Sequence, residues 1–77
     1  MSKKYVWVVE LDFGDIPIRM GIFSSAEKAV EYCLNRIRRM WPNASVCTAR
    51  HDLEDPKSFR DYSHGDRIIS IEQEEIL

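Results

Sequence analysis

The chain has 77 residues and a net charge of −2, with 44% hydrophobic and 31% charged residues. This balance predicts one small folded domain over residues 1–77 and excludes a disordered chain, while the mild negative charge disfavours a dedicated nucleic-acid binder. We find no apolar run that could span a bilayer and no signal peptide at the start, so a cytoplasmic protein with reduced cysteines and no membrane partner is expected.

Residues 5–13 and 16–23 are predicted to form an antiparallel hairpin, because both are rich in β-branched and aromatic types. Gly14-Asp15 supplies the turn, and Pro17 belongs at a strand's start or on an edge because it cannot donate to a ladder. The period of two places five residues of the first strand on one face: Tyr5, Trp7, Val9, Leu11 and Phe13. In the second strand it groups Ile18, Met20 and Ile22.

The next element is a helix over residues 25–41, which ends at Pro42-Asn43. Its apolar residues follow the 3.6-residue period and form one stripe: Ala26, Ala29, Val30, Cys33, Leu34, Ile37, Met40 and Trp41. Ser24 and Glu27 have the spacing of a capping box, which explains the serines before this helix without any catalytic role.

Residues 45–51 are predicted to be a third strand and residues 67–74 a fourth, with Ile69 and Ile71 on one face. The polar segment 52–66 between them is expected to be a long loop, in which Asp55-Pro56 could start one helical turn. The expected fold is therefore α+β with ββαββ order: a four-stranded, mainly antiparallel sheet with one helix packed on one face.

One helix leaves one face of such a sheet uncovered. Either Val6 and Val8 or the aromatic set of the first strand lies on that open face, and large uncovered apolar residues mark an association surface. Two outcomes are open: the 52–66 loop folds back to cover this face, or the protein forms a homodimer through the face or a sheet edge.

The residue types that carry chemistry do not assemble into a catalytic or metal motif. His51 and His64 stand in no recognisable arrangement with a nucleophile, and Cys47 with His51 lacks the paired ligand spacing of zinc sites. Cys33 lies on the core stripe and is expected to be a small buried hydrophobe. No glycine-rich phosphate loop occurs. We therefore expect a non-enzyme without cofactor or metal.

Two groups of residues are candidates for contact with a partner. Lys28, Tyr32, Arg36 and Arg39 form a basic strip with one aromatic along the helix, which suits an acidic protein or nucleic-acid phosphates but is also typical of a solvated helix face. In the expected loop, Phe59, Arg60 and Tyr62 are of the types that anchor interfaces. Alternatively, Phe59 and Tyr62 fix the loop to the core.

The strand "YVWVVEL", the return through "GIFSS" and the helix start "SSAEKAVEY" resemble a diffuse group of small phage and bacterial proteins, over residues 5–34. The resemblance implies an accessory protein that binds and blocks a host protein. The favoured function is thus a protein-binding module, a phage-type inhibitor or modulator of a host protein or defence complex in the host cytoplasm, acting by steric occlusion. The alternative is a binder of nucleic acid or a small anionic ligand through the basic helix face.

Overall fold

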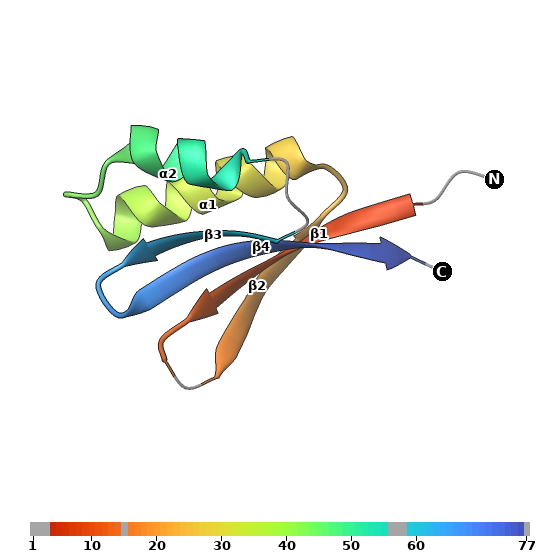
Figure 1. Ribbon diagram of the computed structural model, residues 1–77, viewed down its shortest axis with the longest axis horizontal. Helices are drawn as coiled ribbons and strands as arrows, with labels where there is room; N and C mark the ends of the chain where they lie inside the picture. Colours follow the sequence, from red (N-terminus) through yellow and green to blue (C-terminus); the bar gives the residue numbers. More distant parts are fainter. Residues whose placement is uncertain (1–3, 15, 56–58, 77) are drawn as a thin grey trace.

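Four strands form an open antiparallel sheet, and two helices pack on one of its faces (Figure 1). The structure is a computed structural model that describes residues 4–14, 16–55 and 59–76. The elements are β1 (Lys4–Asp12), β2 (Pro17–Phe23), α1 (Ala26–Met40), α2 (Val46–Leu53), β3 (Phe59–His64) and β4 (Arg67–Ile76). The α+β class is confirmed, but the order is ββααββ rather than ββαββ.

The first hairpin is confirmed, and β2 is an edge strand. It pairs with β1 from Trp7↔Phe23 to Asp12↔Pro17, with a bulge at Val9 and Glu10. Pro17 starts β2, where no ladder bond is lost. The bulge breaks the alternation expected for Ile18, Met20 and Ile22: Met20 packs against the core, whereas the other two are exposed.

The strand order β2-β1-β4-β3 places the last strand beside the first, in the middle of the sheet. β4 pairs with β1 from Lys4↔Ile76 to Asp12↔Ile68, and with β3 from Phe59↔Glu72 to His64↔Arg67. Gly65 has φ +64°, and no other residue of this two-residue turn has a positive φ. Glycine is therefore required only at the first turn position, as in a type II′ hairpin.

The segment expected to be the third strand is helix α2. Ser45 begins it, because its hydroxyl oxygen accepts a hydrogen bond from the Thr48 N–H at 3.2 Å. Ala49 and Leu53 lie four residues apart and are fully buried, so one side of this short helix is held in the core. The expected strand over residues 45–51 was wrong because burial of these two residues outweighs the weak helix propensity of Val46, Cys47 and Thr48.

The expected long loop over residues 52–66 was also wrong. Its first residues end α2, and residues 59–64 form the edge strand β3. A helical turn through Phe59 and Tyr62 is excluded by this strand, and Pro56, its expected start, lies outside the described residues. The third strand is therefore formed by residues 59–64 rather than by residues 45–51.

Helix α1 is confirmed, with a shifted N-terminus. Its N-cap is Ser25, whose hydroxyl oxygen accepts from the Lys28 N–H at 3.2 Å, so the expected capping box of Ser24 and Glu27 was one residue too early. The helix ends as the Trp41 N–H donates to the Ile37 carbonyl at 2.8 Å. Among the described residues, no helix is long and apolar enough to cross a membrane.

The core lies between the helices and the sheet. Its buried cluster is Val9, Leu11, Ala29, Val30, Cys33, Leu34, Ile37, Ala49, Leu53, Tyr62, Ile69 and Ile71. Trp7 packs against this cluster, so the face of β1 with Trp7, Val9 and Leu11 is the one under the helices. Val8 is 2% exposed yet lies outside the cluster, on the opposite face. The choice left open between the two faces of β1 is thereby decided.

Candidate functional site

The basic strip of α1 lies on the side of the helix that faces β2. Two contacts fix the rotation of the helix: Glu31 accepts a hydrogen bond from Arg50 of α2 at 3.3 Å, and the Tyr32 ring lies 5.1 Å from the ring of Phe23 in β2. Positions spaced by three or four residues share a helix side. Tyr32 therefore brings Lys28, Arg36 and Arg39 with it to the β2 side, opposite α2.

The four strip residues differ in exposure. Lys28 and Arg39 are exposed, whereas Tyr32 and Arg36 are half-buried. The Nε of Arg36 is buried and has no hydrogen-bond partner among the described residues. A buried N–H of a charged group that lacks an acceptor is unfavourable by about 1–3 kcal/mol, but this Nε is enclosed by the protein, so a partner can reach only the exposed part of the half-buried side chain.

The strand beside the strip presents an open edge with large apolar side chains. Among the described strands β2 pairs with β1 alone, which leaves its other edge unpaired. Ile18 is 50% and Ile22 55% exposed, and Arg19 between them is exposed as well. Ile18 pairs with the core residue Leu11 and lies on the helix side of the edge, whereas Arg19 and Ile22 pair with Glu10 and Val8 and lie on the other face. We call this edge together with the strip the α1–β2 surface, which spans both faces of β2 and consists of Ile18, Arg19, Ile22, Lys28, Tyr32, Arg36 and Arg39.

The candidates from the expected loop lie on β3 and differ in burial. Tyr62 is only 7% exposed, belongs to the core cluster, and has the Trp41 ring 6.4 Å away. Nη1 of Arg60 donates to the Leu53 carbonyl at 3.2 Å and so connects β3 to the end of α2. Phe59 begins β3, but its side chain lies outside the described part. For Tyr62 this geometry favours the core role that the sequence left open.

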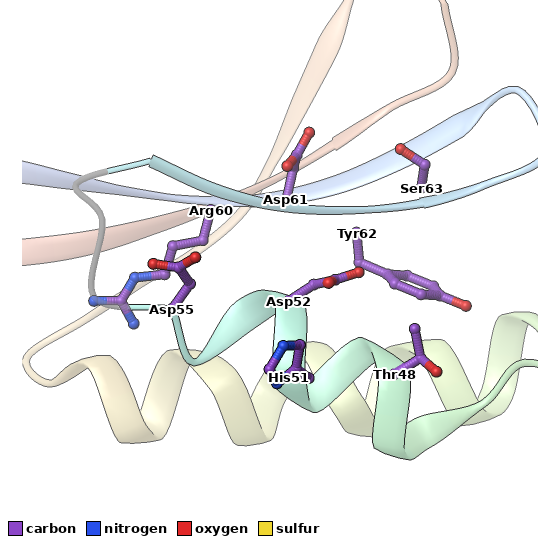
Figure 2. Close-up of a pocket in the computed structure, with 8 residues that line it drawn as sticks. All are labelled: Thr48, His51, Asp52, Asp55, Arg60, Asp61, Tyr62 and Ser63. Atoms are coloured by element: carbon purple, nitrogen blue, oxygen red, sulfur yellow. The ribbon is translucent and has the colours of Figure 1, made fainter.

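A second concave region lies between α2 and β3. This cavity of about 540 Å³ is lined by Thr48, His51, Asp52, Asp55, Arg60, Asp61, Tyr62 and Ser63. Figure 2 shows that Asp61 and Ser63 point away from α2, whereas Tyr62 points toward it. The carboxylates of Asp52 and Asp61 thus lie on opposite sides of β3.

The two cysteines differ in burial and therefore in reactivity. Cys33 is buried in the core, and burial raises the pKa of its thiol from 9.0 to about 12. Because the thiolate is the reactive form, this side chain is inert at neutral pH. Cys47 is exposed on α2, one turn before His51. Within residues 4–14, 16–55 and 59–76, no three His, Cys, Asp or Glu side chains are grouped to hold a metal ion.

The β2 half of the surface and the whole cavity were not predicted from the sequence. Pro17 did indicate an edge strand, and an edge strand with Ile18 and Ile22 could have been recognised as a contact surface from that signal. The cavity had no comparable signal, because it depends on α2, which the sequence pattern assigned to a strand. No protein-family model, no curated protein and no solved structure matches the chain.

Proposed function

We propose that this protein is a non-catalytic protein-binding module that contacts its partner through the α1–β2 surface. Its action is steric: the bound module covers part of the partner, as expected for a phage-type inhibitor or modulator of a host protein in the cytoplasm. Because Tyr62 is buried in the core and Arg60 is half-buried and bonded to the Leu53 carbonyl, we leave both out of the proposed contact set. Tyr32, Arg36 and Arg39 remain as the anchors on α1.

The observation that carries the proposal is the pair of half-exposed isoleucines on an unpaired sheet edge. Ile18 and Ile22 leave about half of their surface in water, although each would be more stable if buried. Apolar residues on an edge strand are an association hazard that proteins usually counter with charges. Here the only charged residue of β2 is Arg19. Their retention is explained if a partner covers them.

The cations beside this edge give the surface its selectivity. Lys28, Arg36 and Arg39 line the same side of α1, and Arg-rich rims with an aromatic residue are typical of protein interfaces. Tyr32 is half-buried against Phe23 at 5.1 Å, so its ring is already held in one orientation. A rigid aromatic loses little conformational freedom on binding.

Photo-crosslinking tests this surface against the rest of the protein. A photoreactive residue replaces Ile22 or Arg39 in one pair of variants, and Asp52 in the cavity in a matched control. Each variant is produced in the cell that naturally contains the protein. We expect the same discrete adduct from positions 22 and 39 and none from position 52. An adduct from position 52 alone would move the site to the cavity, and no adduct at any position would contradict a binding module. An adduct of twice the chain's mass would identify the partner as a second copy.

The second candidate is a binder of nucleic acid or a small anionic ligand. It is favoured by the density of cations in the second half of α1, where Arg36, Arg38 and Arg39 follow within one turn. Against it, one side of the Tyr32 ring is taken by Phe23, which limits base stacking. Fluorescence anisotropy with a labelled oligonucleotide decides: steeply salt-dependent binding that Arg36→Glu with Arg39→Glu abolishes would favour this candidate.

A further inference from the structure

The two edges of the sheet differ in how they are protected. β3 carries Arg60 and Asp61 and packs against α2, so its edge has the charges that discourage pairing with another strand. β2 has seven residues, of which Arg19 alone is charged. In Figure 1, β2 lies at the outer side of the sheet and diverges from the helices toward its start. Pro17 and the bulge interrupt the first half of the β2 edge, and its uncharged second half, from Met20 to Phe23, is the part that can accept a further strand.

From this edge we propose that the partner supplies an extended acidic segment, which adds to β2 as a fifth strand of the sheet. The inference rests on the proposed function and specifies the chemistry of the partner. Backbone N–H and C=O groups of the segment pair with those of β2, as in other cases of strand addition. Segment carboxylates then lie beside the cations of α1.

Charge complementarity decides the class of segment. The α1–β2 surface contains four cations: Arg19, Lys28, Arg36 and Arg39. The register places Glu10 of β1 opposite Arg19, which leaves the three helix cations for a ligand. The described residues that form salt bridges on α1 and α2 are Glu31, Arg50 and Glu54, none of which belongs to the strip. An acidic segment neutralises this excess of positive charge, whereas a basic segment is repelled by it.

A second copy of this chain is a poor occupant for the same reason. Pairing β2 with β2 around a two-fold axis would bring the two basic strips to the same interface. Like charges facing each other across an interface are unfavourable by several kcal/mol in low dielectric and remain repulsive at the surface. The charges of the surface therefore oppose a homodimer through this edge, even though the apolar residues would permit it.

The strand geometry also specifies the pattern of the segment. Side chains of an added strand point alternately to the two faces of the sheet. Those on the helix side lie toward Tyr32 and the half-buried Arg36. Those on the other side extend the face that holds Val8 and its cross-strand neighbour Ile22. An alternation of carboxylates with β-branched apolar residues fits both faces.

The test uses a capped eight-residue peptide in which valine and glutamate alternate. Isotope-labelled protein is titrated with it, and the backbone amide signals of β2 are followed by NMR. We expect saturable shifts in β2 and in the strip of α1, weaker at high salt. A peptide with lysine in place of glutamate should bind at least tenfold more weakly. Equal affinity for the two peptides, or shifts confined to the α2–β3 cavity, would overturn the proposal.

Backbone methylation separates strand addition from simple charge attraction. Two further peptides carry N-methyl groups on every second amide, one set on each edge of the extended chain. Only the amides on the edge that faces β2 donate hydrogen bonds to it. The peptide that is methylated on this edge should therefore bind at least tenfold more weakly, and the peptide that is methylated on the other edge should keep its affinity. Equal loss or equal retention in both would contradict the fifth strand.

The crosslinking experiment distinguishes a failure of strand addition from a failure of the proposed binding function. If position 22 captures a partner but the valine–glutamate peptide does not shift the β2 signals, the binding module stands and strand addition falls. Arg36→Gln with Arg39→Gln provides the matched variant. It should weaken the glutamate peptide at least tenfold while the dispersed amide spectrum shows that the fold is retained. Unchanged affinity in that folded variant would remove the role of the helix cations.

Discussion

The ring of Tyr32 in α1 lies 5.1 Å from the ring of Phe23 in β2, with a tilt of 42° between the two planes. This contact joins the helix to the edge strand. The Phe23 ring also lies over Gly21, since a Cβ built on that glycine would meet the ring at 3.1 Å. Phe23 therefore covers a position of β2 that has no side chain of its own, and Tyr32 holds Phe23 in place.

A double-mutant cycle on Tyr32→Ala and Phe23→Ala should reveal this coupling. We expect an interaction energy of about 0.5–1.5 kcal/mol between the two rings, which is the usual value for an aromatic pair. Urea denaturation of the wild type, the single variants and the double variant measures it. Strictly additive losses would show that the two rings act independently.

Because Ser25 is the N-cap of α1, the free energy of unfolding should be more sensitive to its substitution than to that of Ser24. Ser25→Ala removes the acceptor for the Lys28 N–H and should lower the free energy of unfolding by about 1 kcal/mol. Ser24→Ala is the matched control and should change it by less than about 0.5 kcal/mol. Chemical denaturation of both variants gives the comparison. A larger loss at Ser24 would return the cap to the position that the sequence pattern indicated.

The turn between β3 and β4 requires glycine for conformational rather than steric reasons. Gly65 has φ +64°, and a Cβ added there would meet nothing within 4 Å. Gly65→Ala should therefore be destabilising by about 1–2 kcal/mol, the strain of an L-residue in the left-handed region. Asp66→Ala in the same turn serves as the control. Thermal unfolding of both variants measures the effect, and equal midpoints would be inconsistent with it.

The two thiols should differ in reactivity. Cys47 is exposed and should be alkylated by iodoacetamide in the native protein at pH 8. Cys33 is buried, its pKa is raised to about 12, and it should react only after unfolding. Mass spectrometry of the native and the denatured protein counts the adducts. Two rapid additions to the native protein would show that the core opens on the timescale of the reaction.

The raised pKa of Cys33 also predicts a loss of stability in alkali. The thiol ionises in the unfolded chain from about its ordinary pKa of 9.0 but stays neutral in the folded protein up to about 12. The stabilising effect is thus complete below pH 9 and lost as pH rises toward 12, with a slope of about 1.4 kcal/mol per pH unit. Urea denaturation at pH 8 and pH 10.5 should show it, and the pH dependence should be smaller in Cys33→Ala.

The parts of the fold that the sequence predicted correctly have long, regular apolar patterns. α1 has five fully or nearly fully buried residues at helical spacing, and β1 and β4 place Val9 with Leu11 and Ile69 with Ile71 in the core at a spacing of two. Such patterns can be predicted from the sequence because each further buried residue falls at the same spacing and supports the same element. The capping residue shifted by one because two adjacent serines offer the same hydroxyl, and only the backbone conformation at Ser25 decides between them.

α2 and β3 were missed because each contributes too little to the core to show a period. α2 has two buried residues, Ala49 and Leu53, which is a single i, i+4 pair. β3 is an edge strand in which Tyr62 is the one residue of the described side chains that is buried. In both segments tertiary packing, not the local sequence, selects the structure.

The candidate site was predictable only on its helix side. The basic strip follows directly from the period of α1, and the contact of Tyr32 with Phe23 places it beside β2. Pro17 indicated an edge strand, but which side of β2 stays unpaired follows only from the pairing of β4 with β1. The bulge opposite Val9 and Glu10 places the side chains of Ile18 and Ile22 on opposite faces of the sheet, and it has no sequence signal either.

The position of β4 beside β1 has a consequence for how the protein folds. The two central strands are the first and the last elements of the described chain, and all of β2, α1, α2 and β3 lies between them. The β1–β2 hairpin can form early on the ribosome, but the inner edge of β1 stays unpaired until residues 67–76 have been synthesised. Closing so long a loop slows folding relative to a domain with local pairings. We therefore expect the nascent chain to depend on chaperones during this interval, when β1 still lacks β4 at its inner edge.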